Sequence, residues 1–120
     1  MTVSFAIRAA TQADNNFIQS SIRKTYHVFK PEYDFTSGNN SILIACDSED
    51  STVSYSFIIV NQDNELVFGF TKPIFRRFGL FKALLEYFPD RPSHYITQPS
   101  HQAQKALKAL KLTYLVRIPL

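Results

Sequence analysis

The sequence predicts a mixed α/β (α+β) domain, in which a mostly antiparallel sheet of about six strands is flanked by about three helices. The chain has 120 residues, the usual length of one domain, so residues 1–120 are expected to form a single unit. Hydrophobic residues make up 45% of the chain, which is enough for a packed core. The spacing of these residues changes several times between the two-residue period of strands and the helical period.

The first half of the chain reads as a strand, a helix and a hairpin-rich sheet. Residues 3–8 alternate apolar and polar side chains, as a half-buried strand does. A capping box from Thr11 to Asp14 begins a helix over about residues 12–29, and a loop follows at 30–40. Short polar turns then separate three runs rich in β-branched and aromatic residues. They predict an antiparallel meander over 41–46, 53–60 and 65–71.

The second half returns to the helical period twice. Apolar residues recur from Leu80 to Phe88, and prolines end that helix. A short strand is expected over 93–97. The helix that begins after Pro99-Ser100 should turn four residues inward, namely Ala103, Ala106, Leu107 and Leu110. Its lysines, Lys105, Lys108 and Lys111, should face solvent, and a last strand covers 114–118.

Composition excludes several classes of protein. The single cysteine, Cys46, lies in an apolar run and is expected to be a buried, inert thiol, so neither an internal disulfide nor a multi-cysteine zinc site can form. No apolar run reaches the roughly 18 residues of a membrane span, and no secretory signal is visible, which predicts a cytoplasmic protein. Residues 1–64 carry a net charge of −3 and residues 65–120 a net charge of +6, so an anionic partner should meet the second half.

The stretch from Glu65 to Glu86 carries the most specific pattern. A strand leads through Thr71-Lys72-Pro73 into Arg76-Arg77-Phe78-Gly79-Leu80-Phe81-Lys82-Ala83-Leu84-Leu85-Glu86. This stretch resembles the signature of the GCN5-related N-acetyltransferase (GNAT) family, Pro-x-x-Arg-Gly-x-Gly-Ile-Gly-x-Ala-Leu-Leu-Glu. The matching positions are Pro73, Arg76, Gly79, Ala83, Leu84, Leu85 and Glu86. Residues 7–14 are also similar to the family's first strand and helix opening, so the resemblance implies a GNAT-like fold.

The resemblance implies a phosphate cradle at the start of the helix after Gly79. Backbone N–H groups at a helix N-terminus attract anions, and glycine lets a ligand approach closely. In the family this cradle holds the pyrophosphate of acetyl-CoA (coenzyme A). Here it would consist of Arg76, Arg77, Phe78, Gly79, Leu80 and Phe81. The alternative is an ordinary amphipathic helix with a basic first turn, although two arginines there oppose the helix dipole.

The preceding strand holds the other candidate residues. Glu65 stands at the spacing of a family glutamate that deprotonates the amine through water, which makes it the candidate catalytic residue; the alternative is a solvated acid at a hairpin turn. Gly69 and Thr71 would supply the backbone that pairs with pantetheine. Two residues depart from the family pattern. Phe81 replaces a small residue and could crowd the pyrophosphate, and Leu107 stands where the family often has a tyrosine as general acid.

The resemblance implies acyl-CoA-dependent transfer of an acetyl group to a primary amine on a small molecule or a protein. The competing hypothesis, favoured by Phe81 and Leu107, is a GNAT-derived binding or structural protein without catalysis. No metal site is expected, because His27, His94 and His101 lack metal-ligand spacing. Neither a membrane nor a nucleic acid is expected as a partner. The sequence does not settle the oligomeric state, although the aromatic-rich and β-rich C-terminus could pair with another copy in a homodimer. Small proteins of this kind also occur in tailed bacteriophages, so a phage protein of the host cytoplasm or the virion fits the resemblance.

Overall fold

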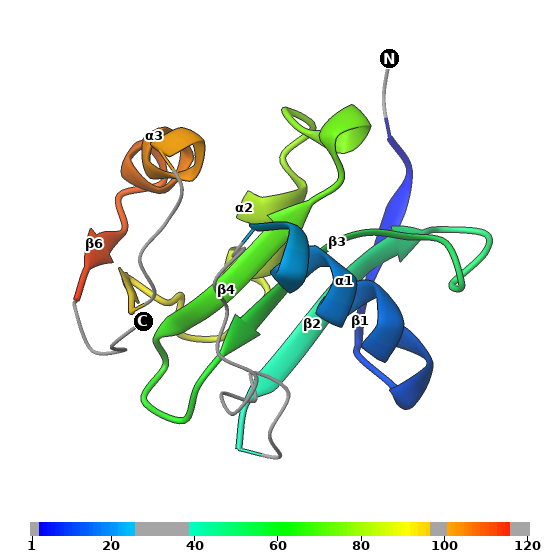
Figure 1. Cartoon of the computed structure of the whole chain (residues 1–120), viewed down its shortest axis with the longest axis horizontal. Helices are drawn as coiled ribbons and strands as arrows, with labels where there is room; N and C mark the ends of the chain where they lie inside the picture. Colours follow the sequence, from blue (N-terminus) through cyan, green and yellow to red (C-terminus); the bar gives the residue numbers. More distant parts are fainter. Residues whose placement is uncertain (1–2, 26–38, 97–100, 116–120) are drawn as a thin grey trace.

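In the computed structural model, which describes residues 3–25, 39–96 and 101–115, six strands form one sheet in the order β1-β2-β3-β4-β5-β6. The strands are β1 (Phe5–Ala9), β2 (Ser41–Asp47), β3 (Ser54–Val60), β4 (Leu66–Thr71), β5 (His94–Tyr95) and β6 (Thr113–Tyr114). The α-helices are α1 (Asn15–Thr25), α2 (Leu80–Glu86) and α3 (His101–Ala109), and the 3-10 helices are η1 (Gln12–Asp14) and η2 (Pro73–Phe75). Strands β1 to β4 are antiparallel, whereas β4–β5 and β5–β6 are parallel. The predicted mixed fold is confirmed (Figure 1).

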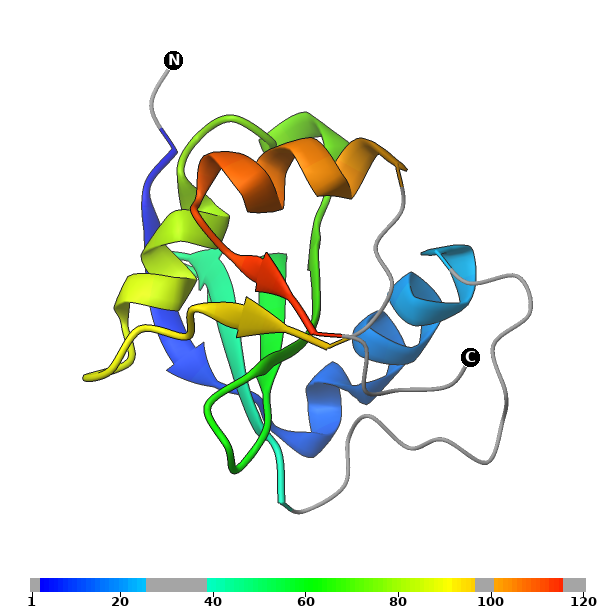
Figure 2. The same ribbon diagram turned by 90° about the vertical axis from the view of Figure 1, so that its left-hand side faces the viewer.

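Helices cover both faces of the sheet (Figure 2). On one face, called the α1 face below, Ile18 and Ile22 pack against Phe57 in a buried cluster. On the other, the α2 face, leucines of α2 and α3 pack against side chains of β2, β3 and β4. The buried members of that cluster from α2, α3 and the residues just after α3 are Leu80, Leu84, Leu85, Leu107 and Leu112. Residues 42–46 of β2 and 57–60 of β3 alternate between the two clusters, as the two-residue period predicts.

An ion pair fixes the N-terminal part of the chain to the sheet. The Arg8 guanidinium donates two hydrogen bonds to the Asp14 carboxylate, at 2.7 and 2.8 Å, and a third to the carbonyl of Ser51, at 2.9 Å. The backbone N–H of Thr11 donates to the same carboxylate at 2.7 Å, as the predicted capping box requires. Asp14 is buried, and its hydrogen bond to Arg8 holds the pKa of Asp14 below the usual value. This group joins β1, η1 and the turn between β2 and β3.

The structure changes several predicted boundaries. The predicted helix over 12–29 begins with the 3-10 turn η1 and continues as α1 to Thr25; residues 26–38, with the rest of that helix and most of the predicted loop, lie outside the described residues. The last strand begins at Thr113, and residues 116–118 are likewise outside them.

The predicted inner face of α3 differs from the structure at one described position, and the burial of Ala103 lies outside the described residues. Ala106 was predicted to face inward but is exposed, because α3 packs through a narrow stripe that includes the buried Leu107. The three lysines at 105, 108 and 111 are exposed as predicted, and Cys46 is buried. Within the described residues, no helix is both long and apolar enough to cross a bilayer.

Candidate functional site

Strands β4 and β5 meet at only one end. Leu66 pairs with Tyr95, and the N–H of Ile96 donates to the carbonyl of Leu66 at 3.0 Å. Val67 is an extra residue in β4, because Ile59 pairs with Phe68 while the neighbouring pair joins Val60 to Leu66. Such a bulge increases the local twist of a strand and turns it away from its neighbour. Beyond it, residues 68–71 of β4 have no strand on the β5 side within the described part of the chain.

The loop after β4 is attached firmly to the α2 face. The N–H of Lys72 donates to the carbonyl of Tyr55 at 3.0 Å, and the ring of Phe75 in η2 stacks on the Tyr55 ring with the centroids 4.1 Å apart. The Thr71 hydroxyl already has a hydrogen-bond partner, the hydroxyl of the buried Ser56 at 2.7 Å. These contacts fix the direction in which the chain enters the predicted cradle.

Two residues of the predicted cradle adopt the left-handed backbone conformation. Arg77 has φ of 71° and Gly79, the N-cap of α2, has φ of 76°. A β-carbon built at Gly79 would meet nothing within 4 Å, so the space above this glycine is open. The first helical hydrogen bond is donated by the N–H of Ala83 to the carbonyl of Gly79 at 3.0 Å, so the N–H groups of residues 80–82 precede it and have no helical acceptor.

The side chains of the two cradle arginines lie differently. Nε of Arg76 donates to the carbonyl of Thr71 at 3.1 Å, and its guanidinium carbon is 6.0 Å from the centroid of Phe70. Phe70 packs on the α1 face, so Arg76 extends toward the face opposite α2. Arg77 is exposed. Arg76 is exposed as well, but its contacts with Thr71 and Phe70 hold its side chain on the other side of β4 from α2.

The remaining cradle residues contribute side chains to the core. Leu80 is buried, and Phe78 and Phe81 are half-buried against the cluster on the α2 face. The ring of Phe81 lies against the α-carbon of Gly69. The sequence predicts that Gly69 lets a ligand approach β4 closely. In the structure the ring of Phe81 occupies the space next to Gly69 instead. Phe81 thus turns away from the open space at Gly79 and toward β4.

Glu65 lies at the other end of β4 from the cradle, about 20 Å along the strand from Thr71. Its side chain is only 5% exposed, which contradicts the alternative of a solvated turn residue. The Asn61 side-chain amide donates to Oε1 of Glu65 at 3.1 Å, while the N–H of Glu65 donates to Oδ1 of Asn61 at 2.9 Å. A carboxylate held in this way has a fixed orientation, which a general base requires.

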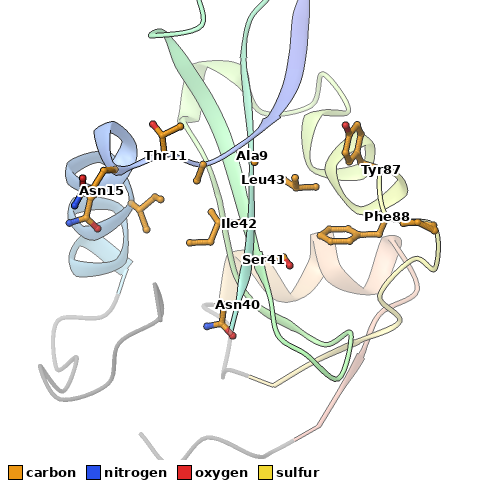
Figure 3. Close-up of a pocket in the computed structure, with 13 residues that line it drawn as sticks. Ala9, Thr11, Asn15, Asn40, Ser41, Ile42, Leu43, Tyr87 and Phe88 are labelled. Atoms are coloured by element: carbon orange, nitrogen blue, oxygen red, sulfur yellow. The ribbon is translucent and has the colours of Figure 1, made fainter. Parts of the chain in front are cut away.

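Sequence reasoning missed one hollow in the molecule (Figure 3). It is a pocket of about 720 Å³ at the edge of the sheet where β1 ends and β2 begins, between the start of α1 and the end of α2. Amides and hydroxyls line it, among them Asn15, Asn40 and Tyr87, over an apolar floor that includes Ile42 and Phe88. None of the predicted site residues lines it. No residue pattern marked it, because its lining comes from three separate segments of the chain, 9–18, 40–43 and 87–89.

Two further predictions concern a proton donor and a metal. Leu107, at the position of the family tyrosine, is buried in the cluster on the α2 face and offers no proton. Among the described residues, no group of three or more His, Cys, Asp or Glu side chains is arranged to hold a metal ion.

No protein-family model matches the chain, and no curated protein matches it by sequence. Among solved structures, it is similar to AAC(6')-Iy, an aminoglycoside N-acetyltransferase, in complex with the bisubstrate analogue CoA-S-monomethyl-acetylneamine. The TM-score is 0.63 and the sequence identity 16%, and the match covers 97% of this chain and 95% of that chain. At this identity the likeness describes architecture and no residue's role. The chain therefore has the GNAT fold.

Proposed function

We propose that this protein binds acetyl-CoA and transfers the acetyl group to a primary amine. The observation that carries the proposal is the loop between β4 and α2. There the left-handed residues Arg77 and Gly79 open a basic helix start next to the unpaired edge of β4. The likeness in fold to an acetyltransferase bound to a CoA-containing analogue supports the same function.

The residues of this loop fit a phosphorylated ligand. The N–H groups of residues 80–82 are available to phosphate oxygens, the open space at Gly79 admits them, and Arg77 supplies a positive charge. The edge of β4 from residue 68 to 71 offers N–H and C=O groups to the amide-bearing pantetheine arm, in the way that an added strand pairs with a sheet edge. An arm that follows this edge from the cradle runs toward Glu65.

Glu65 would act as the general base, directly or through water. The amine nitrogen attacks the thioester carbonyl carbon, so a C–N bond forms, the C–S bond breaks, and the electron pair of the C–S bond goes to sulfur. The proton that nitrogen loses goes to Glu65, and the thiolate takes up another proton to give coenzyme A. Asn61 would hold the Glu65 carboxylate toward the amine.

Release of free thiol from acetyl-CoA in the presence of primary amines tests this function. Glu65→Gln should lower kcat by roughly 10²- to 10⁴-fold with little change in acetyl-CoA affinity, because the amide keeps the shape but cannot take the proton. Glu49→Gln, on the exposed turn between β2 and β3, is the matched control and should behave as the wild type. An equal loss of affinity and kcat in Glu65→Gln would count against a base.

A second candidate function is a CoA-binding or structural protein without catalysis. The buried Leu107 favours it, because α3 supplies no proton donor at the position where the family often has one. This candidate predicts that acetyl-CoA binds while no acceptor amine increases thiol release above the rate without protein.

A further inference from the structure

The pocket at the edge of the sheet is separate from the proposed acetyl-CoA site. It opens where β1 leaves β2: the N–H of Ala10 donates to the carbonyl of Ile42 at 3.0 Å, and the chain then turns away into η1. Ser41 pairs with Val60, which pairs in turn with Leu66, so the start of β2 and the start of β4 are two strand spacings apart, about 10 Å. A ligand in the pocket would therefore occupy neither the cradle nor the unpaired edge of β4.

Three elements of the fold bound this pocket (Figure 3). Ile42 and Leu43 of β2 point to opposite sides of the strand, in keeping with their packing against different clusters. Asn15, at the start of α1, lies on one side, and Phe88, just after α2, extends its ring toward β2 on the other. The volume of about 720 Å³ is within the range of about 300–1,000 Å³ that small-molecule sites have. The pocket is therefore large enough for a small ligand.

The floor and the rim of the pocket differ in chemistry. The floor is apolar, because Ile18 and Leu43 are buried there and Phe88 is half-buried. The rim consists of exposed polar side chains, namely Gln12, Asn15, Ser41 and Tyr87. Among the described residues that line the pocket, none carries a charge. The site therefore combines apolar surface with uncharged hydrogen-bonding groups.

The rim groups favour a neutral ligand with several hydroxyls. Amides and hydroxyls both donate and accept hydrogen bonds, so they suit a ligand whose own polar groups do the same. A sugar is such a ligand, and the C–H groups on one face of its ring are apolar. Carboxylates and phosphates only accept hydrogen bonds, whereas an ammonium group only donates them. Either charged group would also lose hydration on entering the pocket, which is costly without a countercharge.

From this arrangement we propose that the pocket binds a neutral sugar. The apolar face of the sugar ring packs on the floor, against Ile42 and Phe88. Its hydroxyls exchange hydrogen bonds with the amides of Gln12 and Asn15 and with the hydroxyl of Tyr87. The site is independent of the proposed acetyl transfer, so the protein has a second ligand, bound on the β1–β2 side of the sheet.

Nuclear magnetic resonance of the isotope-labelled protein tests this site with four neutral sugars: glucose, galactose, maltose and lactose. At least one of them should shift the amide signals of residues 40–43, 87 and 88 saturably. The charged sugars glucuronate and glucosamine should bind more weakly than the best neutral sugar. Cyclohexanol, which has a ring but only one hydroxyl, should bind about tenfold more weakly or less, because it lacks most of the hydrogen bonds.

Two variants test whether the sugar lies in the pocket. Asn15→Ala removes an amide from the rim, and Tyr87→Ala removes an exposed ring with its hydroxyl; each should raise the Kd of the best sugar about three- to tenfold. Gln104→Ala, at an exposed amide of α3 outside the pocket, is the matched control and should bind the sugar as the wild type does.

Other results overturn the proposal in recognisable ways. If none of the four sugars shifts these signals, or if a charged sugar or cyclohexanol binds as tightly as the best of them, the pocket is not a site for a neutral sugar. If Asn15→Ala and Tyr87→Ala both bind as the wild type does, the sugar binds elsewhere. Each of these results leaves the proposed acetyl transfer standing, and a failure to bind acetyl-CoA would leave the sugar site standing.

Discussion

The ring of Phe81 lies against the α-carbon of Gly69, so that a β-carbon at Gly69 would be 2.7 Å from Cζ of Phe81 and nearer still to Cε2. This contact joins the first turn of α2 to the middle of β4. Because it occurs at the start of the helix, it also fixes the helix N-terminus relative to the unpaired edge of β4. The lack of a side chain at Gly69 in β4 therefore makes room for the large side chain of Phe81 in α2, and each residue depends on the other.

Gly69→Ala should destabilise the protein by about 1–3 kcal/mol, because the added methyl group forces the Phe81 ring out of its place. Phe81→Leu shortens the opposing side chain, so the double variant should regain part of the loss. Urea unfolding of the wild type, both single variants and the double variant measures this coupling. Losses that simply add in the double variant would mean that the two residues do not depend on each other.

Arg77→Gly should stabilise the protein by about 0.5–1 kcal/mol, since glycine adopts a φ of 71° without steric cost. Arg76→Gly is the matched comparison: Arg76 has a φ of −71° and loses its hydrogen bond to Thr71, so stability should fall. Thermal unfolding of the two variants should therefore shift in opposite directions. A fall in both would contradict a strained backbone at Arg77.

Asp14→Asn should cost about 1–3 kcal/mol, less than a fully buried pair because Arg8 is 26% exposed. The pKa of Asp14 is lowered in the folded state, from about 3.9 when unfolded. Its contribution is therefore present above about pH 4 and lost as the pH falls through the folded-state pKa. As the pH falls below 4, the free energy of unfolding should decrease less steeply in Asp14→Asn than in the wild type. Asp63→Asn, at an exposed turn, should show the same pH dependence as the wild type. An unchanged acid transition in Asp14→Asn would exclude this ion pair as a cause of acid stability.

The order of strands and helices could be predicted from sequence because each element has its own periodicity. Ile18 and Ile22 are buried on one face of α1, and the meander of β2, β3 and β4 follows from its polar turns. The single contact between β4 and β5 could not be predicted in this way. It depends on the bulge at Val67, which leaves no mark in the alternation of apolar residues.

The candidate site was predictable only as a set of positions. The spacing from Glu65 to Gly79 identified the strand, the turn and the helix start, but it could not show where side chains lie. Arg76 is bound to Thr71, and Phe81 covers Gly69. Both arrangements result from tertiary packing, as does the burial of Glu65 beside Asn61.

Tyr55 should ionise well above the usual pKa of a tyrosine. The hydrogen bond from its hydroxyl to Asp47, at 2.6 Å, raises the pKa of Tyr55 to about 12. Since the unfolded value is about 10, the contribution of this bond is fully present below pH 10 and is lost between about pH 10 and 12. Spectrophotometric titration of tyrosinate should show a step near pH 12 in the wild type, and Tyr55→Phe should lose that step. Tyr87→Phe, at an exposed site, should keep that step. If Tyr87→Phe lost the step and Tyr55→Phe kept it, the step would not belong to Tyr55.

The central claim is that the start of α2 binds the phosphates of acetyl-CoA, and calorimetric titration of acetyl-CoA into the purified protein tests it most directly. Gly79→Glu should abolish binding, because it places a carboxylate in the open space of the cradle, whereas Gly79→Ala changes only the backbone strain and should retain most of the affinity. Saturable binding by the wild type and by Gly79→Ala, with none by Gly79→Glu, is the predicted result. No heat of binding from the wild type at millimolar acetyl-CoA, or unchanged affinity in Gly79→Glu, would contradict it.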